Sequence, residues 1–241
     1  EVEGGRPRGL ERLSLAGCSK VTGKALQAAL ESAPLRRALR ALDLSGSCPA
    51  ATAQLQLPVN GVALRTLKMV QNDTLERLVL QLPSAHPLED INVAGCGSLR
   101  SIFVSAARLR TINATGCARL REVSLRGERL RAVTLAQSPA LERQLTLHAA
   151  ALEDLNLYGC KALPGALLES ALAGAPGLRA LNADGCNEFW SLDLRQVARR
   201  VERLSLNGCK NLQCVRAASP ELLGVGLRAC RALRELHLAD C

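Results

Sequence analysis

One nine-residue pattern, L-x-x-L-x-L-x-x-C, recurs along the 241-residue chain. Its copies begin at Leu10, Leu39, Leu64, Leu88, Leu109, Leu130, Leu152, Leu178, Val201 and Leu222, so their starts lie 21 to 29 residues apart. The fourth and sixth positions are two residues apart, which is the period of a β-strand, so both side chains point to the same side. Ten copies at this period indicate stacked coils that bury one core between neighbours.

The ninth position of the pattern is usually a cysteine. The cysteines there, which we call the ladder cysteines, are Cys18, Cys96, Cys117, Cys160, Cys186, Cys209 and Cys230, with Cys48 one residue late. Asn72 and Ser138 take the position in two other copies. The period lies close to that of leucine-rich repeats, whose consensus has Asn or Cys at the ninth position. We therefore expect a strand-rich α/β solenoid, a single unit of about ten coils over residues 10–241 after an extension of residues 1–9.

Shorter copies of the pattern occur half a period later. They begin at Leu75, Leu99, Leu120, Leu141, Phe189, Leu212 and Leu233. Between Leu88 and Leu152 the return side of each coil has only about 10 residues, too few for a useful helix and two corners. The sequence therefore predicts a flattened tube with parallel strands on both faces there. One residue is inserted in the copy at Leu141, which moves its anchors to Leu145 and Leu147.

The longer coils have room for a helix on the convex side. In residues 19–38, Leu26, Ala29 and Leu30 recur at helical spacing, and we expect Pro34 to close that helix. In residues 161–177 the apolar face of a second helix is Leu167, Leu168, Ala171 and Leu172, with Pro176 after it. We expect the segment Pro49 to Gly61 to be irregular.

The ladder cysteines follow a glycine in most copies, and glycine permits a tight corner after a strand. We expect their thiols to point inward, to stay reduced and to donate weakly to backbone carbonyls. Reduced thiols favour the cytosol or nucleus, or an organelle if a targeting segment was removed. Cys214 lies at an outward position of its half-copy, so we expect it to react first with a thiol reagent. No apolar run approaches the roughly 20 residues of a membrane span.

The residue types that form metal sites and catalytic sites in other proteins are dispersed along this chain. No C-x-x-C pair occurs and His86, His148 and His237 lie in different coils, so the sequence predicts no zinc site and no cofactor. Asp90, Asp154 and Asp184 recur at outward positions, which is typical of a solvated face. With no phosphate-binding loop of the GxxxxGK[ST] type either, we expect a protein that is not an enzyme.

The formal net charge is +9, which suits an acidic partner or a nucleic acid. However, the basic residues are scattered singly and the chain has only four aromatic residues, whereas single-strand binders stack bases on aromatic platforms. Nucleic-acid binding is therefore the weaker alternative to a protein partner.

Equivalent outward positions form two candidate binding surfaces. On the first side, Tyr, Asp, Asn and Arg side chains gather near the C-terminal half, and Tyr and Arg are frequent hot spots. This surface comprises Tyr158, Asp184, Asn207, Arg203 and Arg228. The alternative reading is that the Asn and Ser column of this side only keeps an exposed sheet soluble.

On the second side a basic stripe is expected. It comprises Arg126, His148 and Arg195 in one column and Arg216 with His237 in the next, and it would suit an acidic protein or an RNA backbone. We expect Trp190, in a corner of the same side, to be a packing residue.

The segments LERLSLAGC, LEDINVAGC, LEDLNLYGC and VERLSLNGC resemble the cysteine-containing leucine-rich repeats of F-box proteins. The alternation with half-copies that lack the cysteine, as in GCGSLRSIFVSAARLRTINATGC, more narrowly resembles plant and algal F-box/LRR-repeat proteins. The resemblance implies that the repeats select a substrate while an F-box binds the adaptor of a cullin-type ubiquitin ligase. Only nine residues precede Leu10, so a ligase role would belong to a longer parent protein. The other class considered is a non-catalytic structural subunit of a large protein or ribonucleoprotein assembly.

Overall fold

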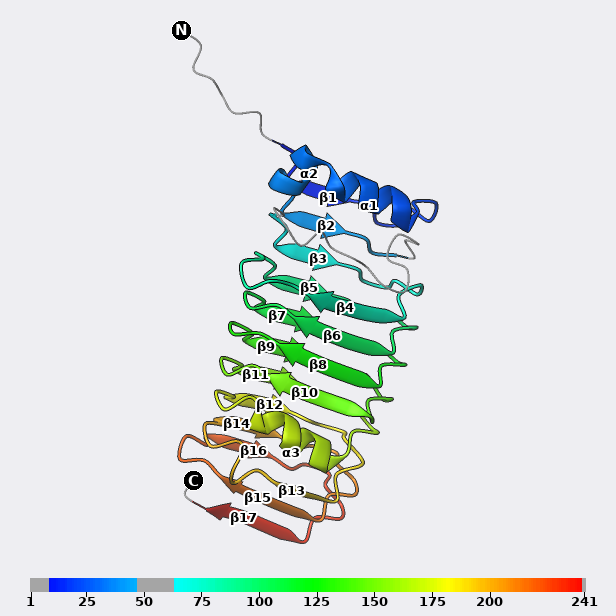
Figure 1. The fold of residues 1–241 in the computed structure, drawn as a ribbon. Helices are drawn as coiled ribbons and strands as arrows, with labels where there is room; N and C mark the ends of the chain where they lie inside the picture. The colour runs from blue at the N-terminus through cyan, green and yellow to red at the C-terminus, as the bar shows by residue number, and fades with distance from the viewer. Residues whose placement is uncertain (1–8, 47–62, 240–241) are drawn as a thin grey trace.

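The computed structural model describes residues 9–46 and 63–239, which form an elongated stack of coils (Figure 1). Each of the ten motifs supplies one strand to a ten-stranded parallel sheet, the first sheet. Its strands, in spatial order, are β1 (Arg12–Ser14), β2 (Ala41–Asp43), β3 (Thr66–Lys68), β5 (Asp90–Asn92), β7 (Thr111–Asn113), β9 (Ala132–Thr134), β11 (Asp154–Asn156), β12 (Ala180–Asn182), β14 (Arg203–Ser205) and β16 (Gly224–Gly226). The predicted leucine-rich-repeat solenoid is confirmed.

The half-copies form strands on the return side. The second sheet contains β4 (Arg77–Gln81), β6 (Ser101–Ser105), β8 (Glu122–Arg126) and β10 (Gln144–His148), and the third sheet contains β13 (Ser191–Asp193), β15 (Cys214–Ala218) and β17 (Glu235–Ala239). All seven half-copies thus pair in parallel, so strands on both faces are confirmed for the middle of the chain and extend beyond it. Leu145 and Leu147 pair with Val123 and Leu125, as the one-residue insertion predicts.

Helices cover the return side of two longer coils. Thr22 caps α1 (Gly23–Glu31) by accepting a hydrogen bond from the Ala25 N–H at 3.3 Å, and Leu26 and Leu30 are buried. The predicted closure at Pro34 is wrong, because α1 ends earlier and Pro34 lies in the first turn of α2 (Ala33–Ala38). Proline is tolerated there since the first N–H groups of a helix have no internal partner.

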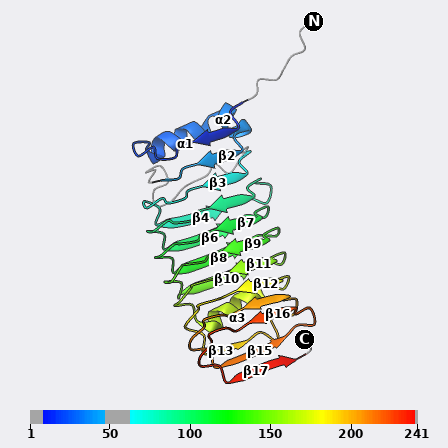
Figure 2. The same ribbon diagram turned by 180° about the vertical axis from the view of Figure 1, so that it is seen from behind.

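The apolar face predicted for the first helix is also too wide, because Ala29 is exposed. The second predicted helix is α3 (Gly165–Ala173), and its Leu168, Ala171 and Leu172 are buried as expected. It packs on β10 and β13 and separates the second sheet from the third (Figure 2). Gly174, the residue after the helix, lies against the backbone of Leu147. A Cβ at this position would be 1.7 Å from the Leu147 carbonyl oxygen, so a larger residue does not fit.

A tight corner follows each strand of the first sheet. Its central residue, the eighth of the motif, has φ between 69° and 75° at all seven positions where glycine occupies it. Gln71, Gln137 and Ala229 adopt φ of 54° to 59° at the same position in the other coils. The left-handed corner is therefore imposed by the coil geometry, and glycine is the residue that adopts it with least strain. The segment Pro49 to Gly61, predicted to be irregular, and Cys48 lie outside the described residues.

Candidate binding surfaces and the cysteine ladder

The ladder cysteines connect each coil to the one before it. The Sγ of Cys96 donates to the Met69 carbonyl oxygen at 2.9 Å, and the Sγ of Cys117 donates to that of Val93 at 3.3 Å. Cys160, Cys186, Cys209 and Cys230 make the equivalent bonds at 3.0 to 3.4 Å. In every case the acceptor is the sixth residue of the preceding motif, so the predicted donation to backbone carbonyls is confirmed.

Asn72 and Ser138 perform the same task in the coils that lack the cysteine. The Nδ2 of Asn72 donates to the Leu44 carbonyl oxygen at 3.2 Å, and the Oγ of Ser138 donates to that of Ala114 at 3.4 Å. Both residues are fully buried. What the ninth position requires is therefore a small hydrogen-bond donor.

Burial keeps the ladder thiols protonated. It raises the pKa of Cys96 to about 11 and those of Cys117, Cys160 and Cys209 to about 12. It raises the pKa of Cys186 as well. A thiol is a nucleophile only as the thiolate, so these buried groups are poorly reactive near neutral pH. The eight cysteines of residues 9–46 and 63–239 are all free.

Three cysteines depart from the expected burial. Cys18 is exposed because the first coil has no described coil beneath it, and Cys230 is half-buried in the last one. Cys214 was expected to be outward and reactive, but it is only 7% exposed. The expectation that it reacts first is therefore corrected: its register is outward, yet the residue is buried.

The polar column at the fifth position shapes the corners. Side-chain oxygens of Asn92, Asn113, Asn156 and Asn182 each accept a hydrogen bond from the N–H two residues later, at 3.0 to 3.1 Å. Asp43 does the same in the second coil. These side chains thus have a local structural role in ending the strand.

The predicted first-side surface contains a hydrogen-bond network across three coils. Asp184 Oδ1 accepts from the Ser205 hydroxyl at 2.6 Å and from the Asn207 N–H at 2.7 Å. The Asn207 Nδ2 donates to Asp184 Oδ2, and its Oδ1 accepts from the Arg228 N–H at 2.8 Å. The polar groups of Asp184 and Asn207 are thus used within the fold.

The other three members of this surface project outward. Tyr158 is 47% exposed, and Arg203 and Arg228 are exposed with no ion pair to any described residue. Of the three, Arg203 lines a shallow groove, together with Asp154 and the small residues Ala180, Gly224 and Gly226. The small residues lower the outer surface of the sheet, so Arg203 stands beside a depression.

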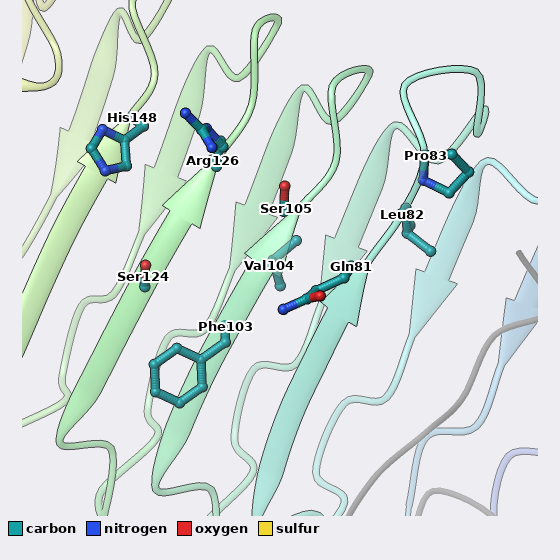
Figure 3. A pocket seen from close by; sticks show the side chains of 9 residues that line it. All are labelled: Gln81, Leu82, Pro83, Phe103, Val104, Ser105, Ser124, Arg126 and His148. Atoms are coloured by element: carbon teal, nitrogen blue, oxygen red, sulfur yellow. The ribbon is translucent and has the colours of Figure 1, made fainter.

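On the second sheet, Arg126 and His148 are direct neighbours in the parallel register. They line a groove together with Gln81, Ser105 and the half-buried Phe103 (Figure 3). Among the described residues, neither side chain has a carboxylate within ion-pairing distance. This part of the expected basic stripe is present.

Arg195 and Arg216 do not continue that stripe. Arg216 lies in β15 of the third sheet and Arg195 in the turn that follows β13, and α3 separates the third sheet from the second. Arg195 pairs with Asp193 at 2.6 Å, and the hydrogen bond holds the pKa of Asp193 down at about 2. Arg216 pairs with Glu235 at 3.3 Å. The expectation of one continuous basic stripe is therefore wrong, because the helix interrupts it and acids neutralise its second half.

Trp190 and His86 lie in opposite environments, the first exposed and the second buried. Trp190 is 57% exposed, so its expected packing role is wrong. His86 is buried, its Nδ1 accepts from the Leu88 N–H, and burial lowers its pKa. His86 is therefore neutral and belongs to the core.

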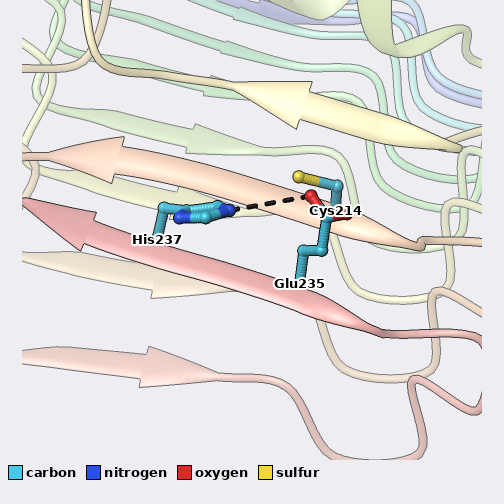
Figure 4. A group of neighbouring side chains, drawn as sticks. All are labelled: Cys214, Glu235 and His237. Atoms are coloured by element: carbon cyan, nitrogen blue, oxygen red, sulfur yellow. Dashed lines mark ion pairs between the residues drawn. The ribbon is translucent and has the colours of Figure 1, made fainter.

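The structure also brings together three residues that the sequence analysis kept apart. Ligand atoms of Cys214, Glu235 and His237 lie within 4.8 Å of one another on the outer face of the third sheet (Figure 4). The signal that could have found them is the register of the half-copies at Leu212 and Leu233, which places the third position of each side by side.

Within residues 9–46 and 63–239, no helix has the length and apolar character that a membrane crossing requires. Comparison of the sequence with models of protein families and with curated proteins finds no match. Among solved structures, the chain is similar to the functional domain of InlJ from Listeria monocytogenes, described as including a cysteine ladder, at 13% identity and a TM-score of 0.26. The match covers 87% of this chain and 59% of that one, and a likeness at this score supports no conclusion about function.

Proposed function

We propose that residues 10–241 act as one protein-recognition module that binds a protein partner on the first sheet, near its C-terminal end. The observation that carries the proposal is the set of Tyr158, Arg203 and Arg228, three large exposed side chains on the first side, of which Arg203 lines a groove with small residues. Solenoids present extended faces for such contacts, and Tyr and Arg are enriched at hot spots.

The network behind these side chains supports a pre-organised surface. Asp184 and Asn207 link three successive coils, and Asn207 fixes the backbone of Arg228. A rigid backbone lowers the entropy lost on binding. Asp184 and Asn207 thus position the surface, while Tyr158, Arg203 and Arg228 contact the partner.

The test uses a partner that is isolated with the full chain, purified, and titrated by calorimetry. Replacing Tyr158 and Arg228 together by alanine should weaken the complex by more than about 2 kcal/mol. The matched control, Arg126→Glu with Arg195→Glu, should leave the affinity nearly unchanged. An unaltered affinity in the first variant would reject this surface.

A narrower form of the proposal is that the module selects substrates for an F-box-type ubiquitin ligase in a reducing compartment, the cytosol or nucleus. It is supported by the resemblance of the LEDLNLYGC-type segments. The full reading frame should then encode an F-box, and its product should co-purify with the adaptor and cullin. A frame without an F-box removes this branch and leaves the recognition module intact.

A second candidate function is a non-catalytic subunit of a large protein or ribonucleoprotein assembly. It is favoured by Arg126 and His148, whose side chains line the second-sheet groove beside Phe103. An acidic protein surface or an RNA backbone would suit them. This candidate predicts the opposite mutational pattern, in which the second-side charge reversal abolishes binding and the affinity falls steeply with salt.

A further inference from the structure

Three potential metal ligands converge on the last two strands of the third sheet. Cys214 of β15 pairs directly with Glu235 of β17 in the parallel register. His237 follows Glu235 by two residues in the same strand, so both side chains point to the same face. Figure 4 shows the three side chains directed toward one another, and their ligand atoms lie within 4.8 Å of one another.

The distances are close to those of a tetrahedral zinc site. Zinc binds thiolate sulfur at about 2.3 Å and imidazole nitrogen or carboxylate oxygen at about 2.0–2.2 Å, so tetrahedral N and O ligands lie roughly 3.4 Å apart. The His237 Nε2 and the Glu235 Oε2 are 3.6 Å apart. Small rotations of exposed side chains are therefore enough to close the site, since both Glu235 and His237 are 57% exposed at the side chain.

The chemistry of the donors selects the ion. A thiolate together with an imidazole suits zinc, whereas magnesium and calcium prefer oxygen ligands only. Cys214 and Glu235, once ionised, would balance the two charges of the ion. Arg216, whose guanidinium lies 3.3 Å from Glu235 Oε2, can remain as a hydrogen-bonding neighbour that orients the carboxylate.

We propose that Cys214, Glu235 and His237 form a three-ligand site for a zinc ion that joins the last two coils. The ion binds the Cys214 sulfur as the thiolate, and the thiol proton leaves to water. The fourth position is open to solvent and is taken by a water molecule. Because all five residues of β17 are exposed, the ion would tie this strand to β15 more firmly than strand pairing alone.

Zinc can bind the Cys214 sulfur only after the thiol has lost its proton. Zinc affinity should therefore increase as the pH rises from 6 to 8, because fewer protons compete for the sulfur.

The full chain, reduced with a non-chelating reductant, is titrated with zinc chloride and separately with cobalt chloride. Equilibrium dialysis should give one zinc ion per chain. The affinity for zinc should fall at least 10-fold in Cys214→Ser and in His237→Ala. Cobalt should produce a thiolate-to-cobalt charge-transfer band that Cys214→Ser abolishes. Zinc should also raise the melting temperature of the native chain and leave that of His237→Ala unchanged.

The matched control is Cys209→Ser, which removes one cysteine five residues away and keeps a donor that the ladder accepts at Ser138. It should bind zinc as the native chain does, and so should Cys18→Ser. Because His237 is exposed, His237→Ala keeps the test decisive if Cys214→Ser fails to fold. Absence of zinc binding, or binding that is unchanged in the folded His237→Ala variant, overturns the proposal.

Discussion

The hydroxyl of Ser138 donates a hydrogen bond to the carbonyl oxygen of Ala114, one coil earlier, at 3.4 Å. This is the bond that the thiol of Cys117 makes to Val93 at 3.3 Å. Both donors are buried, and a buried carbonyl that loses its donor has no water to replace it. The ladder is thus a column of donors that ties coils together, and sulfur is one of three ways to supply it.

The first prediction separates the donor from the sulfur. Cys117→Ala removes the donor and leaves a small void, so it should lower the free energy of unfolding by about 1–3 kcal/mol. Cys117→Ser retains a donor and should cost clearly less. Urea denaturation of the two variants and the native chain measures the difference. Equal losses for alanine and serine would show that the hydrogen bond contributes nothing.

The second prediction concerns the corner before the cysteine. Gly116 has φ of 75°, and a Cβ there would meet no atom closer than 3.8 Å. Gly116→Ala should therefore destabilise the fold by about 1–2 kcal/mol through backbone strain alone. Gly224→Ala is the control, because a Cβ at Gly224 has nothing within 4 Å and its φ is not positive. Thermal unfolding that ranks the two variants equally would contradict the strain argument.

The strands could be predicted because the anchors repeat with a strict register. In β7, for example, Ile112 is inward and pairs with Ile91 and Val133, the same motif position in the coils on either side. The predicted helices were less accurate at their ends. Pro34 carries two opposite signals, since proline both stops a helix and starts one, and the choice depended on the Ser32 break.

The binding surfaces were less predictable, because their side chains interact between coils. Arg195 and Asp193 form an ion pair that neutralises an expected basic position, and no sequence motif predicts this pair. Cys214 and Glu235 are 21 residues apart in sequence and adjacent in space only through the register of β15 and β17. The pattern of inward residues therefore specifies the core. Ion pairs and the exposure of thiols depend on where side chains lie in three dimensions, which the pattern does not give.

The third prediction is the order of thiol labelling. Cys18 is exposed in the first coil, whereas Cys214 is 7% exposed and the ladder cysteines from Cys96 to Cys209 are fully buried. A thiol reagent should therefore modify Cys18 well before Cys214 in the native state. Peptide mass mapping over time measures both rates in one sample. Modification of Cys214 first would restore the interpretation drawn from its outward register.

The fourth prediction is a loss of stability in alkali. Burial raises the pKa of Cys117, Cys160 and Cys209 from 9.0 to about 12, so the folded state retains protons that the unfolded state releases. The stabilisation is complete below pH 9 and is lost as the pH rises from 9 toward 12. Each such thiol contributes a slope of up to about 1.4 kcal/mol per pH unit.

The measurement compares urea midpoints at several pH values for the native chain and for the triple serine variant of these three residues. The native chain should lose stability faster above pH 9. Parallel curves would mean that the buried thiols do not titrate as their burial requires.

The fifth prediction tests the shared core. Ile112 is 1% exposed and Ile102 is fully buried, so each is an inward anchor as the motif predicts. Ile112→Ala should cost about 2–4 kcal/mol, as large-to-small core changes do. Because each coil is stabilised chiefly by its neighbours, amide hydrogen exchange should accelerate in β5 and β9 as well as in β7.

The control is Arg119→Ala, an exposed position in the same coil, which should leave both stability and exchange almost unchanged. Exchange that accelerates in β7 alone would show that the coils unfold independently, and a loss no larger than that of Arg119→Ala would contradict the assigned register.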